Sequence, residues 1–132
     1  MSPHDVFVEK LQKHPELSYC ESIGRLLIKP PSETGFAVEL HSSVDNWTVY
    51  LGNAGFHETF DNAAETLNFM AWCYSGEARV REVWRGVSPE FAALEYFSDG
   101  EWREDSRTGY FFWRYWRAAN EVILQNPNLL AG

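Results

Sequence analysis

The chain has 132 residues, a formal net charge of −8, and a composition that is 45% hydrophobic and 16% aromatic. Its length and apolar content predict a single globular domain, residues 1–132, with its own core. The acidic charge, concentrated in residues 1–76, disfavours nucleic acid and anionic membranes as partners and favours a basic protein.

The two cysteines, Cys20 and Cys73, are too few for the disulfide framework of a secreted protein. We find neither a signal-peptide pattern nor a run of about 18 apolar residues. These observations predict a cytoplasmic protein with free thiols and no membrane partner.

Near-helical spacing of Val6, Phe7 and Leu11 predicts a first helix over residues 4–14, ended by Pro15. Three strands are expected next, at residues 23–29, 35–41 and 47–51. The first is rich in β-formers and stops at two prolines, and the other two alternate apolar with polar residues. The pattern therefore predicts three consecutive antiparallel strands.

Residues 52–55, Gly-Asn-Ala-Gly, are expected to end this sheet. A second helix is expected next, capped by Asp61 or Asn62 and running to Gly76. Strands are predicted at residues 78–84 and 91–97, with a third centred on Trp102 after the turn at 98–101. From residue 110 the apolar spacing becomes helical again, which predicts a last helix through about Gln125.

The expected order of elements is α-βββ-α-βββ-α. It predicts an α+β fold of two layers, in which a largely antiparallel sheet from two three-stranded meanders carries helices on one face. This order resembles the α-βββ-α-ββ-α arrangement of the type III secretion chaperones, which are also small and acidic. The extra strand around Trp102 departs from that arrangement, and the resemblance is an analogy of fold.

Motifs for chemistry are sparse. The segment from His57 to Asp61 resembles the zinc motif His-Glu-x-x-His, but Asp61 replaces the second histidine and helix capping is the favoured role for it. Residues 52–55 lack the endings of phosphate-binding loops, so a turn is favoured. Cys73 is expected in the core. No metal, cofactor or catalytic residue is predicted, and a non-enzymatic protein is favoured while an enzyme stays open.

Three residues of the predicted second meander are candidates for a pocket on the sheet face. Alternation places Glu82 on the side of Ala78, Val80 and Trp84, and Glu95 is interpreted as a second inward acid, with Tyr96 beside it. A bulge near Val83, an exposed edge, or an arginine pairing across the sheet would explain the acids structurally, and this explanation is favoured.

The richest aromatic segment supplies the candidates for partner binding. Trp84 and Trp102 are interpreted as core-facing strand residues. The last predicted helix combines tryptophan with arginine, a composition enriched at interface hot spots. Burial in the core and exposure at an interface both remain open for its four candidate residues, which are Trp113, Arg114, Trp116 and Arg117.

The sequence favours a protein that binds another protein, in the manner of a chaperone, inhibitor or immunity protein. The alternative is a small-ligand or enzymatic pocket on the sheet face that uses Glu82, Glu95 and Tyr96. A third hypothesis is a homodimer whose interface covers the aromatic segment.

Overall fold

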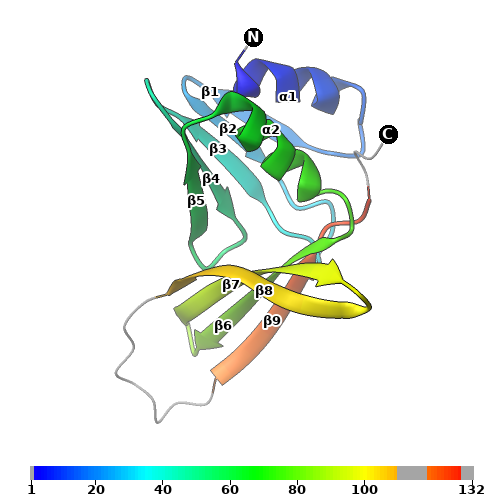
Figure 1. Ribbon diagram of the computed structural model, residues 1–132, viewed down its shortest axis with the longest axis vertical. Coiled ribbons are helices and arrows are strands. Elements are labelled where there is room, and N and C mark those ends of the chain that lie inside the picture. The colour runs from blue at the N-terminus through cyan, green and yellow to red at the C-terminus, as the bar shows by residue number, and fades with distance from the viewer. Residues whose placement is uncertain (1, 110–118, 129–132) are drawn as a thin grey trace.

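The computed structural model describes residues 2–109 and 119–128, which form two helices and nine strands (Figure 1). The elements in chain order are α1 (Pro3–Gln12), β1 (Tyr19–Ser22), β2 (Arg25–Ile28), β3 (Val38–Ser42), β4 (Trp47–Leu51), β5 (Phe56–Phe60), α2 (Ala63–Trp72), β6 (Ala78–Arg85), β7 (Ser88–Ser98), β8 (Glu101–Gly109) and β9 (Ala119–Gln125).

The strands form two antiparallel sheets. The first has five strands in the order β1-β2-β3-β4-β5, and the second has four strands in the order β8-β7-β6-β9. The α+β class and the antiparallel pairing agree with the sequence-based prediction, whereas the strand counts differ from two three-stranded meanders. The difference comes from β1, β5 and β9, which the sequence pattern does not identify as strands.

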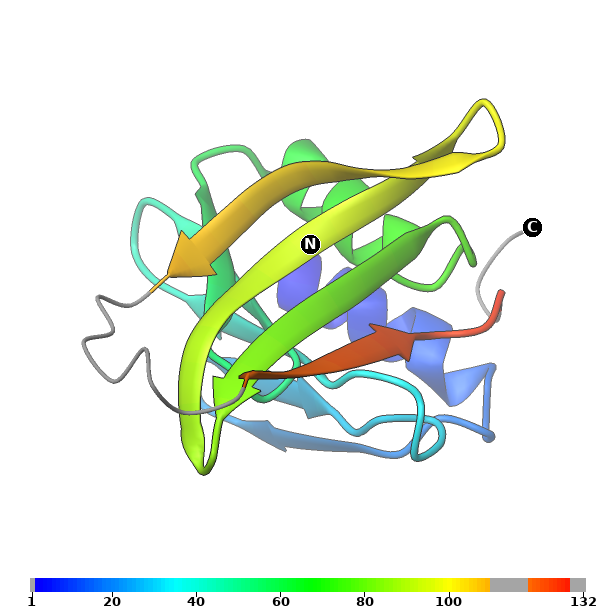
Figure 2. The same cartoon turned by 90° about the horizontal axis from the view of Figure 1, so that it is seen from below.

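Both sheets and both helices contribute to one hydrophobic cluster. Phe7 and Leu11 of α1 and Met70 of α2 are fully or almost fully buried in it. Val80 of β6 and Leu94 of β7 join the same cluster from the second sheet. The two helices contact each other and lie together at one end of the molecule in Figure 1, with the four-stranded sheet at the other end. Figure 2 looks onto that sheet, with the other elements behind it.

Side-chain caps determine where the helices begin. Ser2 precedes α1 and its Oγ accepts a hydrogen bond from the amide of Asp5 (3.2 Å). Asn62 precedes α2, and its Oδ1 accepts from the amide of Glu65 (3.0 Å). Asn62 is therefore the N-cap of α2, and the favoured prediction that Asp61 caps this helix is wrong. None of the described helices is long and apolar enough to cross a membrane.

Cys73 is buried, as predicted, but α2 ends before it, at Trp72, and does not run to Gly76. Cys73 is fully buried, and this burial, with a smaller contribution from the charge of Glu58, raises the pKa of its thiol far above the usual range. Cys73 therefore serves as a small apolar residue of the core.

The segment expected to lead into α2 is itself a strand. Residues 52–55 make the tight turn of the β4–β5 hairpin, in which Gly52 and Gly55 adopt positive φ angles of 73° and 82°. The turn predicted there is present, but it reverses the chain into β5 instead of ending the sheet. Phe56–Phe60 then pairs along the whole length of β4.

The prediction of a helix through Gln125 is wrong for residues 119–125. These residues form β9, which pairs antiparallel with β6. Val122 and Ile123 are β-branched, and alternation places Leu124 on the buried side, where it is 5% exposed. Pairing with β6 satisfies the backbone groups and buries Leu124, so tertiary contacts outweigh the helical spacing. Trp113, Arg114, Trp116 and Arg117 lie outside the described residues.

Candidate functional site

Glu82, one of the three predicted pocket residues, is buried between the two sheets. It is 1% exposed, and its Oε2 accepts hydrogen bonds from the backbone amides of Asn53 (2.6 Å) and Ala54 (2.9 Å) in the β4–β5 turn. The indole Nε1 of Trp84 also donates to its Oε1 (3.4 Å). The carboxylate is thus engaged by donors of the chain itself, and it joins β6 to the other sheet.

Glu95 lies on the opposite face of the second sheet. It pairs across the strands with Arg79, whereas Glu82 pairs with Ala92, and residues 79 and 82 point to opposite sides of β6. Its carboxylate accepts from Arg79 Nε (2.7 Å) and Arg81 Nε (3.1 Å). The inference that both acids share an inward face is wrong for Glu95. Its position on β7 is three residues from Ala92, the partner of Glu82, and side chains an odd number of residues apart on a strand point to opposite faces. The alternative of arginine pairing is confirmed for Glu95.

Trp102 also lies on this arginine-bearing face, contrary to the prediction that it faces the core. Its ring centroid lies 5.4 Å from that of Phe97, with the two ring planes inclined by 59°, and the guanidinium of Arg79 lies 4.4 Å from the Trp102 ring centroid. Trp84, in contrast, packs against the core as predicted. The β6–β7 register shift between Val83 and Trp84 is the bulge considered at this position.

Tyr96, the third pocket candidate, lines a cleft of about 410 Å³ between the sheets. Four elements meet there, namely β5, α2, β7 and β8, all labelled in Figure 1. We call this the Glu58 cleft. Its lining residues are Glu58, Asn68, Phe69, Trp72, Tyr96 and Asp105.

Two carboxylates give the Glu58 cleft its electrostatic character. Glu58 pairs with Val49 and therefore lies on the core-facing side of β5. Burial, followed by the charge of Asp105, raises the pKa of the Glu58 carboxyl above its usual value. The surroundings of Glu58 thus disfavour its ionised form, and a cation bound in the cleft would stabilise it.

Aromatic rings form the remaining walls of this cleft. Phe69 and Trp72 lie on one side of α2, with ring centroids 6.2 Å apart and planes inclined by 43°. Phe60 of β5 lies behind Phe69 at 5.0 Å and packs against the core. Because Phe69 and Trp72 also pack against the core, contacts within the chain hold these walls in place.

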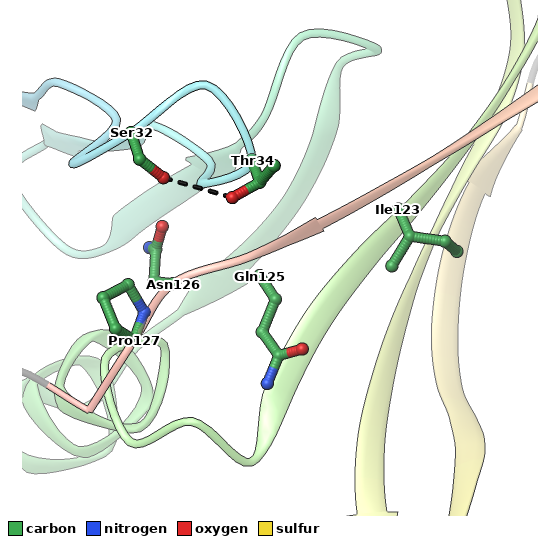
Figure 3. A pocket seen from close by; sticks show the side chains of 6 residues that line it. All are labelled: Ser32, Thr34, Ile123, Gln125, Asn126 and Pro127. Atoms are coloured by element: carbon green, nitrogen blue, oxygen red, sulfur yellow. Dashed lines mark hydrogen bonds between the residues drawn. The ribbon is translucent and has the colours of Figure 1, made fainter.

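A pocket of similar size, about 420 Å³, lies beside the end of β9 (Figure 3). The polar side chains that line it form hydrogen bonds with other groups of the same chain. Asn126 accepts from the amide of Phe36 (2.8 Å) and donates to its carbonyl (3.1 Å), and the hydroxyls of Ser32 and Thr34 bond to each other (3.2 Å). Gln125 donates to the carbonyl of Gly76 (2.9 Å). The described residues that line this pocket include no charged side chain, so the Glu58 cleft is the stronger candidate.

Sequence reasoning misses Glu58 and Asp105. The alternation Phe56, Glu58, Phe60 is a strand pattern with an inward acid, but the sequence-based prediction ends the sheet at residues 52–55 and so places no strand here. The residues around Asp105 in the sequence do not indicate that Glu58 lies across the cleft from it. Within residues 2–109 and 119–128, no group of three or more His, Cys, Asp or Glu side chains is placed to hold a metal ion.

The Glu58 cleft thus combines acidic and aromatic groups suited to a cation. Comparisons with protein families, with curated proteins and with solved structures find no match to this chain.

Proposed function

We propose that this protein acts by binding a basic protein partner, and that the Glu58 cleft receives a Lys or Arg side chain of that partner. The observation that carries the proposal is the combination of two carboxylates and three aromatic side chains around one cleft. Carboxylates form charge-assisted hydrogen bonds with cationic donors, and aromatic faces attract cations through their quadrupole.

The electrostatics of Glu58 favour an incoming cation. A cation compensates both for the burial of this carboxylate and for its repulsion by Asp105, the two causes of its raised pKa. Binding is therefore expected to strengthen as the pH rises through the raised pKa of Glu58, because the ionised form then becomes available.

The charge of the whole chain supports the same kind of partner. A net charge of −8 attracts a basic protein over a distance, which accelerates encounter, and disfavours acidic partners. The effect weakens with added salt, so we expect the association rate to fall as ionic strength rises.

A small cationic ligand is the second candidate for the same cleft. A volume of about 410 Å³ lies within the range of small-molecule sites, and Tyr96 remains part of the lining. In this case a free amine would occupy the cleft without any protein partner.

Photo-crosslinking tests the proposed function directly. The exposed Asn68, at the cleft, is replaced by p-benzoylphenylalanine, and the protein is irradiated in extract of its cells of origin. A matched control carries the same group at the exposed Glu9 of α1. We expect a cross-linked protein with the group at position 68 and not at position 9, lost when Glu58→Gln and Asp105→Asn are added.

Peptide mapping of the cross-link decides among the candidates. A cross-linked segment that contains Lys or Arg supports the proposal, and a segment from a second copy of this chain identifies the partner as self. Undiminished cross-linking after both carboxylates are neutralised, or a contacting segment without Lys or Arg, contradicts it.

A further inference from the structure

Acidic and aromatic side chains line the Glu58 cleft together. We propose that the cleft selects the guanidinium group of arginine over the ammonium group of lysine. This inference rests on the proposed function, since it specifies the group that the same cleft binds.

The chain itself contains the arrangement on which the inference is based. On the outer face of the second sheet, the guanidinium of Arg79 lies 4.4 Å from the Trp102 ring centroid while its Nε donates to Glu95 at 2.7 Å. The guanidinium of Arg107 lies 4.3 Å from the ring of Phe91 and donates to Glu104 at 2.6 Å. In both cases a carboxylate and an aromatic face hold one guanidinium.

The Glu58 cleft offers the same two components. Glu58 and Asp105 supply the carboxylates, and Phe69, Trp72 and Tyr96 supply the rings. No Lys or Arg belongs to the residues that line this cleft in the described part of the chain. A guanidinium from another molecule would complete an arrangement that the chain forms internally on β6, β7 and β8.

Hydration explains why arginine is preferred. An ammonium group is compact and strongly hydrated, and aromatic walls cannot replace the water that it loses. A guanidinium is planar and weakly hydrated at its faces, so it can stack on a ring of the cleft while its edge donates to carboxylates. The aromatic side chains that line the cleft, above all Trp72, therefore produce the preference for arginine over lysine.

Three short peptides test the inference, namely acetyl-Gly-Arg-Gly-amide, the same peptide with Lys, and the same peptide with neutral citrulline. Binding is followed by NMR of the Trp72 indole N–H and the backbone amides of α2 and β5. We expect the Arg peptide to bind about fivefold or more tightly than the Lys peptide, and citrulline to bind no better than the background.

Substitutions in the cleft separate the contributions of charge and of aromatic walls. Glu58→Gln should weaken both charged peptides, whereas Tyr96→Leu should reduce the ratio of Arg to Lys affinity; Trp72→Leu serves as a second test of the ratio if it folds. Glu9→Gln, which removes the same charge from the exposed face of α1, should change neither.

The outcomes distinguish the inference from the proposed function. Equal affinity for the Arg and Lys peptides at the cleft overturns the selectivity and leaves the proposed binding of a basic group intact. Binding of citrulline as tight as that of Arg also overturns it. Failure of both charged peptides to shift the Trp72 signal at millimolar concentration overturns the inference together with the cleft as the binding site.

Discussion

The carboxylate of Glu82 joins the two sheets, and its replacement is expected to destabilise the fold strongly. Its Oε2 accepts from the amides of Asn53 and Ala54, and the side chain is 1% exposed. Its observed donors are N–H groups, two from the backbone and one from Trp84, so hydrogen bonds compensate its burial.

Two opposing effects determine the size of the change in Glu82→Ala. Removal of the carboxylate recovers the cost of burying a charge, which favours the variant. It also leaves the amide of Ala54, a residue 1% exposed, without an acceptor and creates a cavity. An unsatisfied buried donor costs about 1–3 kcal/mol, and with the cavity we expect a net loss of about 3 kcal/mol. Glu82→Gln keeps an acceptor oxygen and should lose about 1 kcal/mol.

Urea unfolding followed by circular dichroism and tryptophan fluorescence measures these free energies. Hydrogen exchange adds a local readout, because the amides of Asn53 and Ala54 should exchange faster in Glu82→Ala than in wild type. Glu9→Ala, at an exposed site, should change the stability by less than about 0.5 kcal/mol. If Glu82→Ala is as stable as wild type or more so, the cost of burying the charge dominates and our reasoning is refuted.

Three further predictions concern the same region and the thiols. Gly52→Ala should destabilise by about 2 kcal/mol or more, because φ is 73° and the new Cβ would lie 2.5 Å from Oε2 of Glu82; wild-type stability in urea would contradict this. The pKa of Glu58 is raised in the folded state, so the native protein binds this proton more tightly than the unfolded chain does. The wild type therefore loses stability as the pH rises from the ordinary pKa of glutamate to the raised pKa of Glu58. Glu58→Gln should therefore gain stability relative to wild type at pH 7 and not below pH about 4, and a gain of equal size at both pH values would show another cause. Iodoacetamide should alkylate the exposed Cys20 of the native protein and spare the buried Cys73, as mass spectrometry can check; equal labelling would show that the core opens readily.

Local patterns of residues account for several elements of the fold. Alternation from Trp47 to Leu51 and from Ala78 to Trp84 predicts β4 and β6 because side chains of a strand point to opposite faces in turn. The α2 cap is predictable because a side-chain oxygen before the first turn satisfies a free amide, and Asn62 does this.

The candidate site is less predictable than the fold. The sequence singles out Tyr96 as a pocket residue, and Tyr96 lines the Glu58 cleft. Glu82 and Glu95, however, lie on opposite faces of the sheet, and neither is among the residues that line this cleft. Glu58 and Asp105 are 47 positions apart in the chain (105 − 58). Their proximity depends on how β5 approaches β8, which neither local segment encodes.

The sequence by itself determined the α+β class, the acidic net charge of −8, and those helices and strands whose apolar residues recur with one clear period. Only the tertiary structure decided the conformation of residues 119–125, because their apolar spacing fits a helix and a strand alike until β6 supplies a partner. It likewise decided the Glu58 cleft, because a site built from β5, α2, β7 and β8 exists only when packing of the core brings those four elements together.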